Sequence, residues 1–425
     1  MSVDSKRKQR PALRIFLCVL AILVASAAIF GFRLLEWGSI PGTNPGATTI
    51  GSPAQSSSGA TQVNSQGQSS LSRQYKQMAS LSVAQMTLEE ELGQLLMVQY
   101  TESTYSPDLD TMINKLYAGG VIMYEFQIQT QKQTRQDIAR MQQRAALPLL
   151  ISTDEEGGPY VHRLATIYGP RLSATQIYQS GDPQVATQQG QKTAHDLVAL
   201  GLNTNLAPDV DVNLVNGYDM VTRTFGNTAD AVIQFAGAYL KGLQGSGVIG
   251  CIKHYPGLGA ALSDAHTGLP VVQRTKSELY AVELAPFKAF IHSPDLLENP
   301  GMIMSTDVLM PAIDAHYPAE LSPTFMTDIL RSEFGYDGVV LTDSLYMDGI
   351  AQQWPLPEAA VLALKAGNDM LLGPAGSAQM VAVINALKAA VRDGTLSKAR
   401  IDEAATRIIA LKMEYHLLPA VPPQA

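Results

Sequence analysis

The chain has 425 residues, of which 46% are hydrophobic and 16% are charged, so it can bury a large core without covalent staples. Its formal net charge of −8 argues against a nucleic-acid partner on electrostatic grounds. The two cysteines, Cys18 in an apolar run and Cys251 in an expected buried strand, predict neither a disulfide framework nor a cysteine metal site.

Residues 1–37 are predicted to be a membrane-targeting segment. Five basic side chains within residues 1–14 precede an apolar run at 15–32, whose 18 residues span about 27 Å as a helix. The basic flank predicts a cytoplasmic N-terminus and an extracytoplasmic remainder. A cleaved signal peptide is the alternative, because Ala-Ser-Ala at 25–27 is typical of a cleavage site, and the protein would then be secreted. The run continues past that site, which favours a retained membrane anchor.

The segment that follows is predicted to be a flexible linker over residues 38–74. Residues 38–72 are rich in Gly, Ser, Pro, Gln and Thr and carry no charged side chain. Such a composition cannot bury enough apolar surface to offset the entropy of folding. The linker would tether a single folded domain, expected over residues 75–418, to the membrane.

Within residues 75–418, short apolar runs alternate with segments of helical periodicity. Helices are expected at 134–146, 182–200, 229–247 and 397–415, and Thr87 to Glu90 has the pattern of a capping box that opens another. The eight expected strands are 94–100, 119–126, 147–156, 200–210, 247–255, 301–308, 338–345 and 369–374.

This alternation predicts an α/β fold with parallel strands, because antiparallel neighbours would not need helical crossovers. Eight units match a single (β/α)8 barrel of the TIM type, and the rival is an open doubly wound sheet. The barrel is favoured because the apolar runs end in polar residues, which a barrel gathers on the one rim where active sites form. No phosphate-binding glycine motif follows a strand, which disfavours a nucleotide enzyme. The rim residues would be Gln99, Glu125, Asp154, Asp209, Lys253, His254, Asp307 and Asp343.

The stretch KHYPGLGAALSDAHTGLP, residues 253–270, gathers a lysine, an aspartate and two histidines after an expected buried strand. Asp264 and His266 are two residues apart, so in an extended segment their side chains point the same way. The carboxylate can hydrogen-bond one imidazole nitrogen and leave the other to exchange a proton near neutral pH. A pair that only braces the loop remains an alternative, as does a metal site of His254, Asp264 and His266, although no known metal spacing supports it.

Asp343 ends another apolar run and can act as a nucleophile, although an N-cap for the next helix explains it equally well. A carboxylate together with a proton-transfer group is suited to cleaving a glycosidic bond with retention of configuration. Asp154 has the same ambiguity as Asp343, and Glu155 and Glu156 fit simple rim charges. Five charged or polar side chains would hold sugar hydroxyls, namely Asp154, Arg163, Arg223, Lys253 and His254.

Motifs from about residue 80 to residue 415 occur in the order found in a known family. They are MTLEEELGQLLMV, DEEGG with VHRL, NTNLAPDVDVN, RTFG, KHYPGLG, DAHTGLP, ELAPF, PAELSP, GYDGVVLTDSLYM and AGNDMLLGP. On these motifs the chain resembles the N-terminal barrel domain of glycoside hydrolase family 3, in its β-N-acetylhexosaminidase branch.

The resemblance implies a retaining β-N-acetylglucosaminidase that acts on terminal β-linked N-acetylglucosamine of cell-wall or chitin-type oligosaccharides. Asp343 would be the nucleophile, His266 the acid/base and Asp264 its partner. The Asp-x-His loop would replace the acid/base that other branches take from a second domain, so no second domain is expected. No metal or organic cofactor is implied, and a monomer is expected. The non-reducing sugar would be bound by Asp154, Arg163, Arg223, Lys253 and His254.

The chain also departs from the family pattern. Leu258 and Ala265 replace residues common in relatives, Pro159 and Tyr160 lengthen the segment before Arg163, and Tyr346 is bulky. The insertion puts the role of Arg163 in doubt. Two other functions stay open, namely a glycosidase or phosphorylase for another β-sugar and a non-catalytic, membrane-tethered sugar-binding protein.

Overall fold

The computed structural model describes residues 65–215, 217, 220–263 and 266–420. The predicted membrane segment and most of the predicted linker lie outside these residues, as does Asp264. Within the described part of the chain, no helix is both long enough and apolar enough to cross a bilayer. The membrane anchor therefore stays a prediction.

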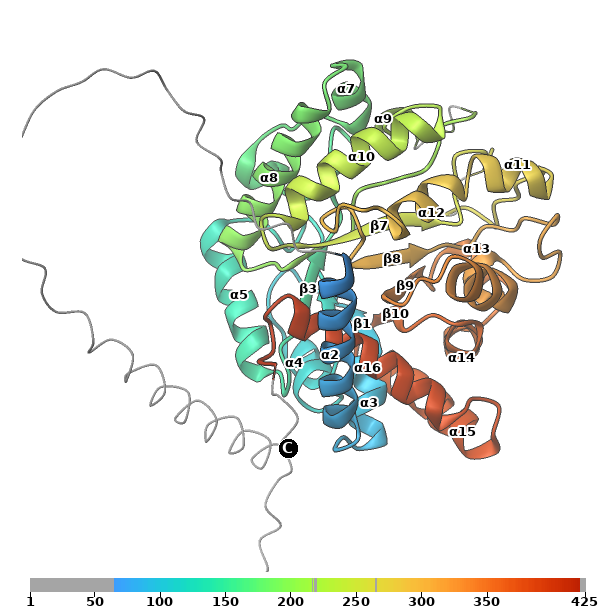
Figure 1. Ribbon diagram of the computed structural model, residues 1–425. Coiled ribbons are helices and arrows are strands. Elements are labelled where there is room, and N and C mark those ends of the chain that lie inside the picture. Colours follow the sequence, from blue (N-terminus) through green and yellow to red (C-terminus); the bar gives the residue numbers. More distant parts are fainter. Residues whose placement is uncertain (1–64, 216, 218–219, 264–265, 421–425) are drawn as a thin grey trace, which may run out of the picture. The chain divides into compact units, whose positions relative to one another are not determined.

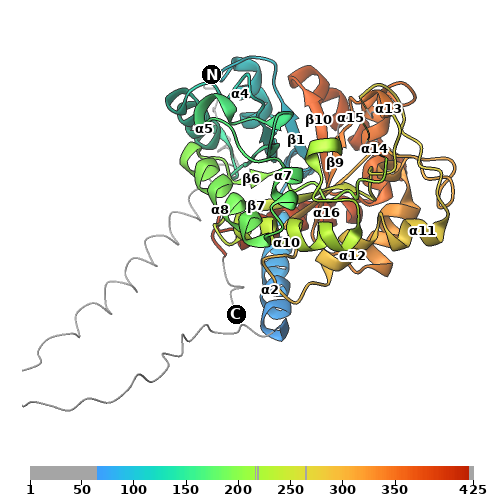
Figure 2. The same cartoon turned by 90° about the horizontal axis from the view of Figure 1, so that it is seen from above.

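Eight parallel strands close into a barrel in the order β1-β10-β9-β8-β7-β6-β3-β2, surrounded by helices (Figure 1, Figure 2). The first and last strands of the barrel pair directly, with Leu96 opposite Leu371, so the open-sheet alternative is wrong. Each strand overlaps one predicted strand, and most of the strands are shorter than predicted. The strands are β1 Leu96–Gln99, β2 Gly120–Ile122, β3 Leu150–Thr153, β6 Thr204–Asn205, β7 Ile249–Tyr255, β8 Met302–Ser305, β9 Val339–Ser344 and β10 Met370–Ala375.

A small antiparallel hairpin, β4 Glu155–Gly157 and β5 Val161–His162, interrupts the alternation directly after β3. The sequence analysis treated Glu155 and Glu156 as the end of a strand and missed this hairpin. Two buried contacts brace it, since Glu155 lies 2.7 Å from His162 Nδ1 and accepts a hydrogen bond from the Leu164 backbone. Glu155 is therefore structural in this fold.

The helices confirm the expected pattern. Thr87 and Glu90 form the predicted capping box of α3, and α8 is capped at its C-terminus by Gly201, whose φ of 98° favours glycine. The helices are α2 Ser65–Val83, α3 Leu88–Gln94, α4 Pro107–Asn114, α5 Gln131–Arg144, α6 Ala165–Tyr168, α7 Ala174–Gln179, α8 Pro183–Leu200, α9 Met220–Arg223, α10 Ala229–Gln244, α11 Lys276–Ala281, α12 Ala285–Ile291, η1 Ala319–Leu321, η2 Thr324–Glu333, α13 Asp348–Ala351, α14 Leu356–Ala366, α15 Ser377–Asp393 and α16 Lys398–Glu414.

The linker prediction is wrong at its C-terminal end, because residues 65–74 belong to helix α2. This helix packs against α16 and buries Met78, Ala79 and Val83 in the core. Tertiary packing of that apolar face outweighs the weak local signal of a Ser- and Gln-rich start. Helix α2 therefore includes the ten residues that directly precede the predicted domain boundary at residue 75.

A buried ion cluster lies at the opposite end of the barrel from the strand carboxyl ends. Asp369, which directly precedes β10 and has no exposed surface, contacts Arg331, Arg400 and Arg407 at 2.5, 2.8 and 3.1 Å. Burial alone would raise the pKa of Asp369, but the three guanidinium groups lower it to about 2. At this end of a barrel, such a cluster serves stability.

We expect Asp369→Asn to lower the free energy of unfolding by about 3–5 kcal/mol, because it leaves partly buried guanidinium groups without their counter-charge. Since the folded pKa lies below the ordinary value of 3.8, this stabilisation is complete above that value and is lost as pH falls through about 2. Denaturant unfolding at pH 7 and pH 3 measures both effects. The control Asp295→Asn breaks an exposed pair with Lys241 and should cost under about 1 kcal/mol. Equal losses in the two variants would contradict the stabilising role.

Candidate active site

Four of the five predicted sugar-binding positions gather at the carboxyl ends of the strands. Asp154 follows β3, Lys253 and His254 lie in β7, and Arg223 ends the short helix α9. Ion pairs link these side chains into one buried cluster, described below. The expectation that the barrel brings Asp154, Lys253 and His254 together on one rim is therefore confirmed.

Lys253 is the centre of the cluster. Its Nζ lies 2.8 Å from Asp154 Oδ1 and 2.7 Å from Glu156 Oε1, and its side chain is 3% exposed. Burial alone would lower the pKa of Lys253, but the two carboxylates raise it above its usual value. The ammonium group therefore stays charged and holds both carboxylates in place.

Glu156 joins Lys253 to Arg223. Arg223 donates from Nε and Nη2 to the two oxygens of Glu156, at 2.8 and 2.9 Å. Burial would raise the pKa of Glu156, but Arg223 and Lys253 lower it, so the carboxylate stays ionised. The sequence analysis read Glu156 as a rim charge and missed this role. Glu155 and Glu156 are adjacent in the sequence, and nothing in the sequence indicates that Glu155 braces the hairpin whereas Glu156 pairs with Arg223.

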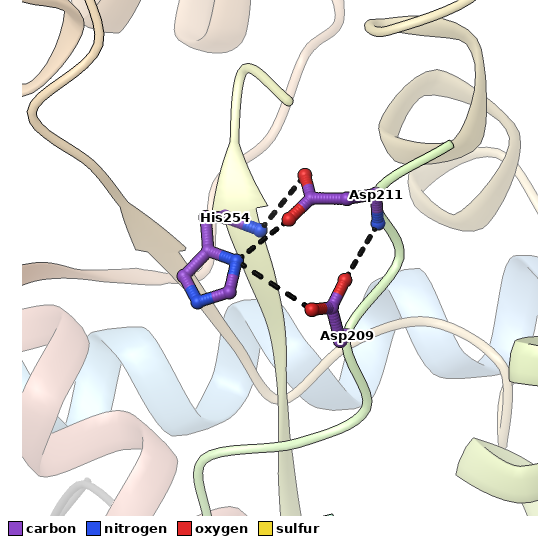
Figure 3. Close-up of side chains that lie close together, drawn as sticks. All are labelled: Asp209, Asp211 and His254. Carbon is purple, nitrogen blue, oxygen red and sulfur yellow. Dashed lines mark hydrogen bonds and ion pairs between the residues drawn. The ribbon is translucent and has the colours of Figure 1, made fainter. Parts of the chain in front are cut away.

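His254 is fixed by two aspartates of the loop after β6 (Figure 3). Its Nδ1 lies 2.7 Å from Asp211 Oδ2 and 3.9 Å from Asp209 Oδ2. Asp211 also accepts a hydrogen bond of 2.7 Å from the Leu258 backbone. The other ring nitrogen, Nε2, lies 3.3 Å from Arg223 Nη2. The orientation of the imidazole is therefore fixed. This role of Asp211 was not predicted from the sequence.

Asp209, Asp211 and His254 also offer ligand atoms within 4.8 Å of one another, which raises the question of a metal ion. Arg223 Nε lies 3.8 Å from Asp209 Oδ2, so a cation already faces this carboxylate. Burial, followed by the charge of Asp211, raises the pKa of Asp209 well above its usual value, which favours its neutral form. A second cation next to Arg223 would be repelled, so the cluster is better suited to holding His254 than a metal ion.

Asp343 lies in β9, with its side chain only partly buried. Its Oδ1 accepts a hydrogen bond of 2.7 Å from the Ser344 backbone, and its Oδ2 accepts one of 3.3 Å from Thr306 Oγ1. The N-cap alternative for Asp343 is wrong, because the next helix, α13, begins at Asp348. A partly exposed carboxylate on the carboxyl-end rim is therefore placed to meet a substrate.

A second carboxyl group lies buried near Asp343. Glu320, in η1, has no exposed surface, and among the described residues neither of its oxygens has a hydrogen-bond partner. Burial raises the pKa of Glu320 well above its usual value, and the charges of Asp307 and Asp343 raise it further. Its neutral form is therefore favoured, which spares Asp343 a like-charged neighbour.

The structure leaves the predicted Asp264–His266 pair untested. His266 has an exposed side chain in the loop after β7, and Asp264 lies outside the described residues. The same gap leaves untested the alternative metal site of His254, Asp264 and His266.

Arg163 differs from the other predicted sugar-binding residues. It follows the β4–β5 hairpin, which carries the inserted Pro159 and Tyr160. Its Nη1 donates to Glu125 at 2.9 Å, and its guanidinium lies 5.6 Å from the centre of the Tyr124 ring. Among the described residues, no ion pair joins Arg163 to the Lys253 cluster.

A closed parallel barrel with a partly exposed carboxylate and a buried cluster of opposite charges on its carboxyl-end rim defines an enzyme of the TIM-barrel type. Residues 87–411 match the family model described as "Glycosyl hydrolase family 3 N terminal domain". The chain therefore belongs to glycoside hydrolase family 3 and is a glycoside hydrolase.

Relatives with known names agree with this assignment. The chain is 32% identical to an "Uncharacterized secreted glycosyl hydrolase" of Arthroderma benhamiae, over 80% of this chain and 97% of that protein. It is 31% identical to a "Beta-hexosaminidase" of Tolumonas auensis, over 64% and 79% of the two chains. Among solved structures, a family 3 β-N-acetylglucosaminidase from Paenibacillus superposes with a TM-score of 0.73 and 34% identity. That match covers 78% of this chain and 63% of the Paenibacillus chain.

The substitution Glu320→Gln tests whether the buried Glu320 is neutral. We expect Glu320→Gln to keep kcat/KM at pH 7 within about threefold, because an amide resembles a neutral carboxylic acid. Since the folded pKa is raised, the wild type loses stability as pH rises above the ordinary value of 4.5, and the variant should not. Melting temperatures from pH 5 to pH 9 measure the difference.

The control Glu358→Gln changes an exposed glutamate of α14 and should leave the pH dependence of stability unchanged. A loss of activity of more than about a hundredfold in Glu320→Gln would show that an ionised Glu320 is needed and would refute the neutral assignment.

Proposed function

We propose that this glycoside hydrolase is a retaining β-N-acetylglucosaminidase that removes terminal β-linked N-acetylglucosamine from cell-wall or chitin-type oligosaccharides. The observation that carries the proposal is the partly exposed Asp343 on the same rim as the Lys253 cluster. The hexosaminidase and β-N-acetylglucosaminidase names of the relatives in Tolumonas auensis and Paenibacillus support the choice of sugar.

In the first step, Asp343 attacks the anomeric carbon and forms a glycosyl–aspartate bond, while the bond to the leaving oxygen breaks. His266 gives its proton to that oxygen. In the second step His266, paired with Asp264, takes a proton from water, which attacks the same carbon and releases Asp343. The two inversions together retain the configuration of the sugar.

Fixed charges would position the sugar for this attack. Lys253 and Asp154 form one ion pair, and Arg223 and His254 lie in contact with each other. These contacts fix the orientation of the polar atoms of all four side chains. Such groups hold hydroxyls without reorganising during the reaction. Arg163 is proposed as a binding residue too, but through the loop after β2.

We also propose that the domain acts outside the cytoplasmic membrane, held by residues 1–37 or released after their cleavage. The basic and apolar pattern of that segment supports the proposal. The secreted relative in Arthroderma benhamiae is consistent with an extracellular site of action.

Turnover of paired chromogenic substrates tests the function. We expect release of 4-nitrophenol from the β-N-acetylglucosaminide, little from the β-glucoside, and a loss of kcat of at least about a thousandfold in Asp343→Ala, because the nucleophile is absent. The matched control Asp393→Ala removes an exposed aspartate of α15 and should keep wild-type turnover.

Other outcomes separate the alternatives. Release from the glucoside alone would keep the family and overturn the sugar. Formation of a sugar 1-phosphate in phosphate buffer would indicate a phosphorylase. Binding of N-acetylglucosamine without turnover would support a non-catalytic sugar-binding protein.

A further inference from the structure

Two aromatic rings stack on the rim just after β2. The ring planes of Tyr124 and Phe126 differ by 7°, and their centroids are 6.2 Å apart. Tyr124 is half-buried, whereas Phe126 is 42% exposed. An ordered, water-facing aromatic ring beside an active site offers a flat apolar surface to a ligand.

This aromatic pair adjoins the proposed reaction centre. In the barrel β2 is the neighbour of β3, the strand that precedes Asp154. Arg163, which is itself proposed to bind the sugar, lies with its guanidinium 5.6 Å from the centre of the Tyr124 ring. Phe126, stacked on Tyr124, therefore lies on the part of the rim that Arg163 contacts.

Polar groups accompany the rings. Arg163 stands over Tyr124 and donates to Glu125, the residue between the two aromatics. The Nε of Arg163 is buried and has no hydrogen-bond partner among the described residues. The Glu125 side chain is 56% exposed, so it can accept further hydrogen bonds. An apolar ring face bordered by a guanidinium and a carboxylate matches a pyranose, which has apolar C–H faces and a hydroxylated edge.

We propose that Phe126, stacked on Tyr124, and Glu125 form the binding subsite for the sugar on the leaving-group side of the cleaved bond. The ring of that sugar packs on Phe126, and its hydroxyls bond to Glu125. Arg163, which contacts both Glu125 and Tyr124, joins this subsite to the non-reducing sugar that it is proposed to bind. This inference rests on the proposed function and deepens it, because it makes a carbohydrate the preferred leaving group. The inserted Pro159–Tyr160 hairpin, which precedes Arg163, belongs to the same part of the rim.

The test compares two substrates that differ only in the leaving group, N,N′-diacetylchitobiose and methyl β-N-acetylglucosaminide. Released N-acetylglucosamine gives kcat/KM for each. In Phe126→Ala we expect the ratio of the disaccharide value to the methyl glycoside value to fall about tenfold, because only the disaccharide places a ring on Phe126. Phe126→Trp should keep the ratio within about threefold of wild type.

The matched control is Val198→Ala, which trims a 54% exposed apolar side chain on α8 and should leave the ratio at the wild-type value. A ratio unchanged in Phe126→Ala would overturn the subsite, and so would equal losses on both substrates, which indicate a structural role. Failure of the wild type to cleave either substrate would instead refute the proposed function.

Discussion

Two buried cations, Lys253 and Arg223, share the carboxylate of Glu156, and the candidate site is built on this arrangement. Lys253 comes from a barrel strand, Glu156 from a hairpin and Arg223 from a short helix, so their ion pairs tie three elements together. Each charge is costly to bury alone, and each is stabilised by the others. The result is a rim whose polar groups are already oriented before a ligand arrives, which is the condition for electrostatic catalysis.

Carboxyl groups with different surroundings complete the site. Glu156 is held ionised by two cations, whereas Glu320 and Asp209 are buried among other acids and favour their neutral forms. Asp343, in contrast to these three, is partly exposed and hydrogen-bonded. This division explains how several acids can occupy one rim without destabilising it: each has a charge state set by its neighbours. Asp343 is a carboxylate that a substrate can reach.

The sequence predicted the barrel well because eight apolar runs alternate with helical periodicity, and parallel pairing follows from the crossovers. It predicted Asp154, Lys253 and His254 as neighbours because strand ends converge in this fold, whereas Arg223 was expected only to bind sugar and comes from a helix. It could not separate Glu155 from Glu156, which differ only in which face of a short hairpin they occupy. It also missed Asp211 and Glu320, whose roles depend on burial. Helix α2 was missed because its first residues are polar and only packing on α16 shows why it forms.

Trapping the covalent intermediate tests the central claim, that Asp343 is the nucleophile. The protein would be treated with 5-fluoro-β-N-acetylglucosaminyl fluoride, which forms the glycosyl–enzyme quickly and releases it slowly, and digested for mass spectrometry. The account predicts one added fluoro-N-acetylglucosaminyl group on the peptide that contains Asp343, and none in Asp343→Ala. A label on another carboxylate, or steady turnover of substrate with no label at all, would contradict it.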